Sequence, residues 1–298
     1  MSTTARMQQF LSLFVWGTTG IVCAWLLYEP AQALAVAGVL WGVHPLMLAV
    51  QFEVARRVNA LRGGTACGAF PWRAWWSEVR ASAWVFGVWQ PWGWQRFPND
   101  VVSGVGRPQG VLFVHGFACN RGFWNPWLSV LRKGRRPVAA LNLEPVLGSI
   151  DRYSAAIDEA VDRLTQAAGQ PPLVVAHSMG GLAVRAWLRN TPGALARVAH
   201  VVTLGTPHQG AWLARFGYGV NAAEMRLGSD WLVRLAATEP PEIATRFTCW
   251  VSTDDNIVFP TATAVLPGAQ VHQLDGVGHV ALATHPRVMA QVMGLLSP

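Results

Sequence analysis

Two long apolar runs, separated by a short polar segment, occupy most of the first 52 residues. Residues 10–28 contain no charged side chain, and a second uncharged run extends from residue 31 to residue 52. Each run has about the 20 residues that a helix needs to cross a bilayer. Glu29-Pro30 between them suits a tight turn. The pattern predicts a transmembrane helical hairpin within residues 1–62, with helices at about 10–28 and 31–52 and interface anchors at Trp16, Trp25 and Trp41.

Two other interpretations of this region remain open, namely a cleaved signal peptide and the buried helices of a soluble domain. The small residues of segment 31–35 resemble a signal-peptide cleavage site, although the second apolar run continues through them. Arginines stand before the hairpin at Arg6 and after it within residues 56–62, whereas the turn carries only Glu29. The positive-inside rule then predicts a multi-pass protein of the bacterial inner-membrane type with a cytoplasmic catalytic domain.

Residues 63–107 are rich in tryptophan, and we interpret them as an amphipathic arm or linker. The pattern over residues 71–89 predicts a helix with Glu78 and Arg80 on its polar side. Such a helix suits the membrane interface, where tryptophan is favoured. It equally suits an arm packed against the domain that follows, and the two arrangements are not exclusive.

From about residue 108 the pattern changes to short β-rich runs that alternate with segments of helical period. The predicted strands are 111–114, 138–141, 173–176, 200–204, 247–251 and 270–274, and the predicted helices are 121–133, 151–168, 179–190 and 280–295. This alternation is typical of a mostly parallel sheet with helices on both faces. We therefore predict an α/β catalytic domain over residues 108–298.

Composition narrows the possible classes of protein. The chain of 298 residues is 52% hydrophobic and only 13% charged, which excludes a disordered chain and disfavours an ordinary cytosolic enzyme. The net charge is +7, but no block of five or more like charges occurs, so we expect no nucleic-acid partner. The histidines and the four cysteines do not occur at metal-ligand spacing, and we predict no metal and no organic cofactor.

The strongest chemical signal lies at residues 173–181, where the sequence is Leu-Val-Val-Ala-His-Ser-Met-Gly-Gly. A buried strand, a sharp turn at Ser178 and a helix are expected here, which is the context that lifts a nucleophilic serine clear of a sheet. The motif is A-x-S-x-G, with Ala176 at a position where glycine is usual. A serine that only caps the helix is the alternative.

Two later segments supply the partners that such a serine needs. His279 follows the last predicted strand, where it can act as general base, and Asp254 and Asp255 follow the strand before it. The order Ser, Asp, His is the one expected for this sheet topology. Backbone N–H groups of Met179 and Phe117 are the expected oxyanion hole, because they belong to the turns after two neighbouring strands. We expect His115 to be structural.

From about residue 108 to its end, the chain resembles the α/β-hydrolase-fold lipases and esterases. The resemblance is closest to small bacterial lipases with alanine at the first glycine of the nucleophile motif. It rests on the segments 114–117, 176–181, 203–208, 255–258 and 276–279. It implies Ser178 as nucleophile, Asp255 as acid and His279 as base, and the family pattern D-x-[IV]-V favours Asp255 over Asp254.

The expected activity is hydrolysis of carboxylic esters of apolar acyl chains by a membrane-anchored serine hydrolase, with a lipid or small apolar ester as substrate and the bilayer as partner. The segment 207–246 is expected to form an apolar cap over the serine, although the same residues also suit helices that close the core. An acyltransferase or thioesterase with the same triad, or a non-catalytic membrane scaffold, are the alternatives. The sequence does not indicate the oligomeric state.

Overall fold

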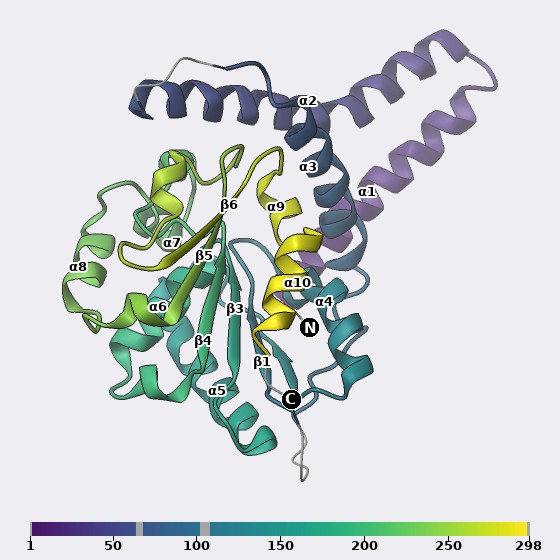
Figure 1. Ribbon diagram of the computed structural model, residues 1–298. Helices are drawn as coiled ribbons and strands as arrows, with labels where there is room; N and C mark the ends of the chain where they lie inside the picture. The colour runs from purple at the N-terminus through teal and green to yellow at the C-terminus, as the bar shows by residue number, and fades with distance from the viewer. Residues whose placement is uncertain (1, 64–67, 102–107, 297–298) are drawn as a thin grey trace.

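The computed structural model describes residues 2–63, 68–101 and 108–296, so parts of the predicted arm, 64–67 and 102–107, lie outside the described residues. Its centre is a six-stranded sheet, parallel throughout, in the order β2-β1-β3-β4-β5-β6 (Figure 1). The strands are β1 (Val111–Val114), β2 (Val138–Ala140), β3 (Leu173–His177), β4 (His200–Leu204), β5 (Phe247–Ser252) and β6 (Gln270–Leu274). The predicted parallel sheet is confirmed.

Both faces of this sheet are buried by helices. Along β1, Leu112 and Val114 belong to one buried cluster, and Val111 and Phe113 belong to the other. The first cluster contains α5 (Ser154–Ala168) and α6 (Met179–Asn190), and the second contains α4 (Asn125–Leu131) and α10 (Pro286–Gly294). Alternate side chains of a strand point to opposite faces, so a strand buried on both sides must be apolar throughout.

Helix boundaries depart from the prediction where capping or proline intervenes. The predicted helix 280–295 is divided into α9 (His279–Leu282) and α10, and the break falls before Pro286, which has no N–H to continue a helix. The predicted helix 151–168 begins instead with a 3-10 turn over residues 150–153. That turn is capped by Ser149, whose side chain accepts a hydrogen bond from Asp151 N–H.

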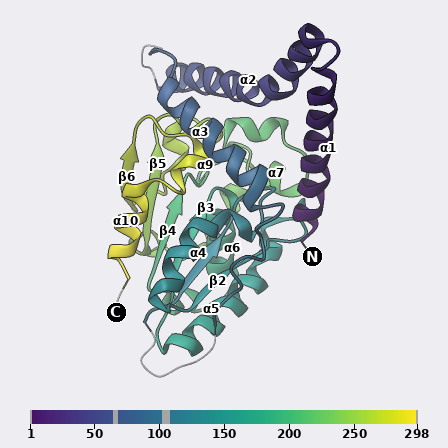
Figure 2. The same ribbon diagram turned by 90° about the vertical axis from the view of Figure 1, so that its right-hand side faces the viewer.

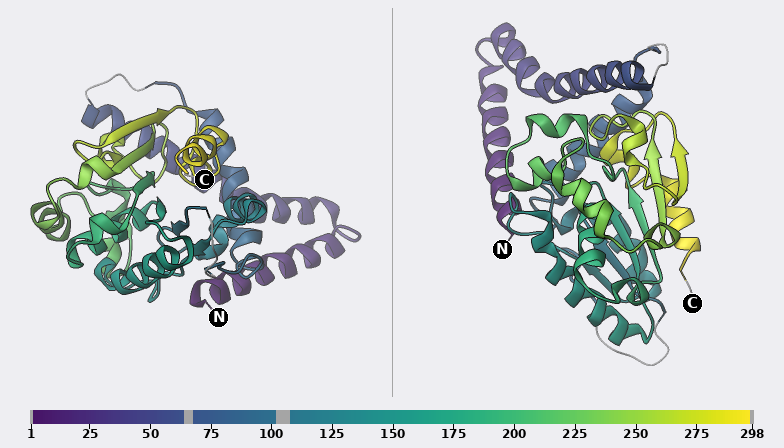
Figure 3. Two further views of the ribbon diagram at one scale, coloured as in Figure 1. Left: turned by 60° about the horizontal axis from the view of Figure 1, so that its bottom comes forward. Right: turned by 90° about the vertical axis from the view of Figure 1, so that its left-hand side faces the viewer.

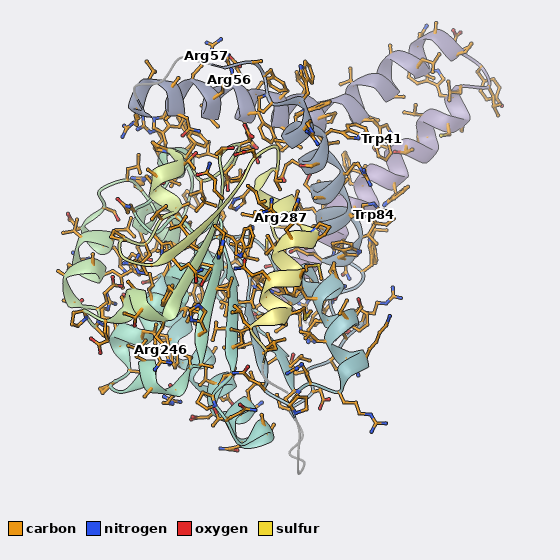
Figure 4. All side chains as sticks on the ribbon, in the orientation of Figure 1. Trp41, Arg56, Arg57, Trp84, Arg246 and Arg287 are labelled. Carbon is orange, nitrogen blue, oxygen red and sulfur yellow. The ribbon has the colours of Figure 1, made fainter. Side chains whose placement is uncertain are left out.

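The N-terminal region forms a helical hairpin, with α1 (Thr3–Trp25) and α2 (Pro30–Gly63) joined at residues 26–29, so its first helix begins and ends earlier than the predicted 10–28. Figure 1 shows the tip of the hairpin projecting away from the sheet domain. The second half of α2 turns across the carboxyl ends of the strands. Trp41 lies on the projecting part, whereas Arg56 and Arg57 lie on the part over the domain (Figure 4). Helix α2 is therefore longer than the predicted helix 31–52.

One described helix, Pro30–Gly63, is long and apolar enough to cross a membrane by length and composition. The mean hydropathy of its most apolar window is 1.9, and 11% of that window is buried. Large apolar side chains of the hairpin are exposed in both helices, among them Phe10, Leu13, Leu34 and Val39. This helix is a candidate membrane span.

Helix α3 (Trp72–Trp84), continued by a π turn over residues 85–89, crosses the sheet domain beside α9 (Figure 2). One prediction for this helix is wrong: Glu78 is not on a solvated polar face but is 1% exposed, whereas Arg80 is exposed. The arm thus packs on the sheet domain. Figure 3 shows α1 running along another side of the same domain, with the chain terminus at its lower end.

Candidate active site

Ser178 occupies a strained turn between β3 and α6. Its backbone angles are φ +54° and ψ −130°, a region that non-glycine residues rarely adopt. The turn is tight because a Cβ at residue 180 would collide with the Val114 carbonyl oxygen and lie 2.6 Å from that of His115. Residue 181 likewise packs against the Thr206 side chain. Gly180 is therefore required by the backbone of β1 and the next residue, and Gly181 by the side chain of Thr206.

His279 and Asp255 form a buried pair at the same edge of the sheet. Asp255 Oδ2 lies 2.8 Å from His279 Nδ1, and both side chains are almost completely buried. Burial lowers the pKa of His279, but the charge of Asp255 and its hydrogen bond raise it, and the net direction is upward. The structure brings Asp255 to the imidazole, whereas Asp254 accepts a hydrogen bond from Gly276 N–H at 2.7 Å.

The pair lies against the nucleophile turn. The ring of His177, which directly precedes Ser178, is centred 4.5 Å from the ring of His279. Its Nε2 donates a 3.1 Å hydrogen bond to the His279 carbonyl oxygen. Within the described residues no hydrogen bond joins Ser178 Oγ to His279 Nε2. Bonds of this kind are often long in unliganded enzymes and tighten when substrate binds.

The two amides predicted for the oxyanion hole are free to bind an anion. Among the described residues, neither the Phe117 nor the Met179 N–H donates a hydrogen bond within the chain. A Cβ at Gly116 would lie 2.8 Å from Ser178 Cβ, which places the turn after β1 directly beside the serine. His115 is tied into the fold instead, because its Nδ1 lies 2.8 Å from the Gly116 carbonyl oxygen and its Nε2 accepts from Leu143 N–H.

An apolar cavity of about 310 Å³ opens beside Ser178 and Phe117. Its remaining wall comes mostly from the predicted cap and from the loop after β5, with Leu213, Phe216, Met225, Ile257 and Val258 among the lining residues. Other apolar residues of the cap, Trp231, Leu232 and Leu235, lie in the buried core. The segment 207–246 therefore does both things considered for it: one part lines a cavity and another closes the core.

Sequence reasoning missed a set of polar side chains from the N-terminal region that hold the loops of the site. Gln51 of α2 accepts from Asn256 Nδ2 at 3.0 Å, and Asn256 Oδ1 in turn accepts from His279 N–H at 3.1 Å. Gln90 Oε1 accepts from Asn120 N–H at 2.8 Å in the loop that carries Phe117. Nothing in the local pattern around these glutamines distinguishes them from solvated polar residues.

The base-bearing turn is held in the same way by α3. Ser77 Oγ accepts from Gly278 N–H at 3.2 Å, and the Glu78 carboxyl group accepts from the N–H groups of Val280 and Ala281 at 2.9–3.0 Å. Burial raises the pKa of Glu78 to about 7, against the lowering effect of these bonds and of His279. In the described part of the chain, no group of three or more His, Cys, Asp or Glu side chains is placed to hold a metal ion.

Comparison with known proteins agrees with this geometry. Residues 110–226 match the family model of the alpha/beta hydrolase fold. A search of curated protein sequences found no match. Among solved structures, the mature form of a Bacillus licheniformis lipase is similar, with a TM-score of 0.58 and 18% identity, over 68% of this chain and 97% of that one.

A second similar structure is lipase B of Aspergillus fumigatus, with a TM-score of 0.54 and 17% identity. The alignment covers 64% of this chain and 54% of that one, so this chain spans about half of that lipase. At these identities the likeness is one of fold. The sheet domain has the α/β-hydrolase fold. The α/β-hydrolase fold expected from the motifs is confirmed.

Proposed function

We propose that the protein is a serine hydrolase that cleaves carboxylic esters of apolar acyl chains, with Ser178, His279 and Asp255 as its catalytic triad. The observation that carries the proposal is the apolar cavity beside Ser178, at the edge where the buried His279–Asp255 pair also lies. A cavity with this lining favours an acyl chain and excludes water from the serine.

The proposed reaction first forms and then hydrolyses an acyl-serine, and His279 transfers the proton in both halves. His279 Nε2 takes the proton of Ser178 Oγ as this oxygen attacks the ester carbonyl carbon, and the amides of Phe117 and Met179 stabilise the resulting oxyanion. The imidazolium then gives its proton to the leaving alkoxide, and the C–O bond breaks to leave an acyl-serine. Water attacks this ester with the same proton transfers and releases the acid. Asp255 holds the ring with Nδ1 protonated throughout.

The test is covalent labelling of the detergent-solubilised full chain with a fluorophosphonate probe. We expect the parent to be labelled, Ser178→Ala to remain unlabelled, and Asp255→Asn to be labelled much more slowly. Asp254→Asn is the matched control, because its carboxylate contacts Gly276 N–H rather than the imidazole. An unlabelled parent that stays folded and is also silent with lipid vesicles would contradict the proposal, as would equal labelling of Ser178→Ala.

We further propose that the hairpin anchors the enzyme in a bilayer, because its apolar side chains are exposed while its ends pack on the sheet domain. Val39 on α2 and Val233 on α8 (Asp230–Thr238) are 66% and 61% exposed, so they make a matched pair. Val39→Asp should lower co-sedimentation with phospholipid vesicles, because a buried aspartate costs about 3 kcal/mol at a helix centre. Val233→Asp should not. Equal binding of both variants would contradict anchoring.

The predicted arrangement of a hairpin within 1–62, an arm within 63–107 and a catalytic domain from 108 becomes part of this proposal. We place the catalytic domain in the cytoplasm, on the basis of the arginines that flank the hairpin. A reporter enzyme fused after residue 298 tests the orientation, since a fusion active only on the opposite side of the membrane would contradict it.

A further inference from the structure

Helix α3 brings a carboxyl group to the base-bearing turn that the proposed mechanism does not use. The Glu78 side chain is 1% exposed and reaches the first turn of α9, which begins at His279. Its oxygens accept hydrogen bonds from two successive backbone N–H groups, those of Val280 and Ala281. These are the two residues that follow the proposed base, so the position of Glu78 determines where the turn can lie.

The fit between α3 and this turn is close. A Cβ at Gly278 would lie 2.5 Å from both Cβ and Oε2 of Glu78, so only glycine leaves room for the carboxyl group. Ser77 Oγ, from the neighbouring residue of α3, accepts from Gly278 N–H. The turn that carries His279 is therefore held by α3 on one side and by Asn256 on the other.

The electrostatic surroundings give this carboxyl group an unusual set of partners. Within the described residues, no arginine or lysine forms an ion pair with Glu78. The titratable groups that face it are His279 and Asp255, and the charge of His279 lowers the pKa of Glu78 while that of Asp255 raises it. The ring of His177 also lies against that of His279, and burial holds the pKa of His177 well below the ordinary value, so it stays neutral. A positive charge on His279 therefore acts on Glu78 without a competing arginine or lysine ion pair among the described residues.

We propose that Glu78 is a positioning residue for the base: its carboxylate fixes the turn that carries His279 and places a second negative charge, beside that of Asp255, close to the imidazolium formed during catalysis. This inference rests on the proposed function and deepens it. Asp255 binds the ring directly, and Glu78 acts through the backbone of residues 280–281 and through space. The N-terminal arm is then a working part of the active site.

The experiment compares the pH profiles of kcat/KM for p-nitrophenyl butyrate in the full-length parent, Glu78→Gln and Glu78→Asp. Asp158→Asn is the control, because Asp158 also accepts side-chain hydrogen bonds, but from Trp187 and Arg197, neither of which belongs to the site. At pH values where the Glu78 carboxyl group is ionised, above about 7, Glu78→Gln removes a negative charge near His279 and so lowers the pKa of His279. The acid limb should therefore move to lower pH by about one unit, and the plateau should fall roughly 10-fold because the imidazolium of the transition state loses that stabilisation.

Glu78→Asp separates the effect of the negative charge from the effect of side-chain length. Glu78→Asp keeps the charge but is one methylene short of the turn, so its acid limb should stay near that of the parent while its plateau falls. It also carries the test if Glu78→Gln does not fold, since a shifted acid limb in Glu78→Asp would overturn the proposal. Asp158→Asn should match the parent in both features.

An unshifted acid limb in folded Glu78→Gln would show that Glu78 only stabilises the fold, and would overturn the inference. That outcome leaves the proposed function intact, because the parent would remain active and would label with fluorophosphonate. A parent that neither hydrolyses the ester nor labels would overturn both proposals.

Discussion

The serine turn and the loops that carry His279 and Asp255 are fixed in different ways. The turn is fixed by close backbone packing: Gly180 lies against the end of β1, and Gly181 lies against Thr206. The other two loops are fixed by polar side chains that come from the N-terminal region, chiefly Gln51 and Glu78. Steric contact acts within the sheet domain, whereas the polar contacts join parts of the chain about 200 positions apart.

This difference indicates that the N-terminal region, beyond the anchoring proposed for it, also holds the loops of the site. Each of its helices makes at least one polar contact with a loop of the site: α1 through Gln8, which donates to the Ala118 carbonyl oxygen, α2 through Gln51 and α3 through Glu78. The outer parts of both hairpin helices carry exposed apolar side chains, among them Phe10 and Val39. The region thus contacts the sheet domain through polar side chains at its base and exposes apolar side chains, on which the proposed anchoring rests, farther out.

The largest effect is expected from a change in the close contacts that fix the serine turn. Gly180→Ala adds a methyl group that meets backbone carbonyl oxygens of β1 and the following residue, neither of which is the end of a flexible side chain. We expect a loss of about 3 kcal/mol in the free energy of unfolding, together with loss of fluorophosphonate labelling. Gly134→Ala is the control, because no atom lies within 4 Å of the added carbon. Thermal unfolding of both variants measures the difference, and similar melting temperatures would contradict it.

The serine turn, which these close contacts fix, is also the part of the site that the sequence predicts well. Small residues at fixed spacing around Ser178, after an apolar strand, report a local backbone conformation, so the pattern alone places the turn. The order of strands then brings Asp255 and His279 to the same edge. Glu78 was misplaced for the opposite reason: a single carboxylate in an amphipathic pattern is usually solvated, and only the tertiary contact with α9 shows that it is buried.

The second effect follows from the buried carboxyl group. The pKa of Glu78 is raised by burial to about 7, above the ordinary value of 4.5. The folded protein therefore holds this proton more tightly than the unfolded chain, and the stabilisation is complete below pH 4.5 and is lost as pH rises through 7. Between pH 5 and 8, the parent should lose about 2.5 kcal/mol more of its free energy of unfolding than Glu78→Gln loses.

Chemical unfolding at the two pH values measures this difference. Asp158→Asn gives a comparison of opposite sign: burial raises the pKa of Asp158, but hydrogen bonds from Trp187 and Arg197 outweigh it and hold the pKa below the ordinary value. Removing that carboxyl group removes stability that is present at neutral pH and lost in acid. Equal pH dependence in the parent and Glu78→Gln would mean that Glu78 is solvated.

Asn256 should give a smaller effect, because it joins the N-terminal region to the base through one bond on each side. Its side chain is completely buried, donates to Gln51 and accepts from His279 N–H. Asn256→Ala leaves that N–H without its acceptor, which costs about 2 kcal/mol of stability. We expect a fall in kcat with little change in KM, since the acyl cavity is untouched. Asn190→Ala, at an exposed position on α6, should match the parent in kcat, in KM and in the free energy of unfolding.

Gln51→Ala should have the smallest effect, and it tests the base of the hairpin most directly. It removes the acceptor for Asn256 Nδ2 and leaves the bond from His279 N–H to Asn256 in place. The expected loss is about 1 kcal/mol. Gln32→Ala, at an exposed position on the same helix, should have none. In a double-mutant cycle, Gln51→Ala should cost little more once Asn256 is alanine, because the two side chains share one hydrogen bond. Strict additivity would show that α2 does not support the His279 turn through Asn256.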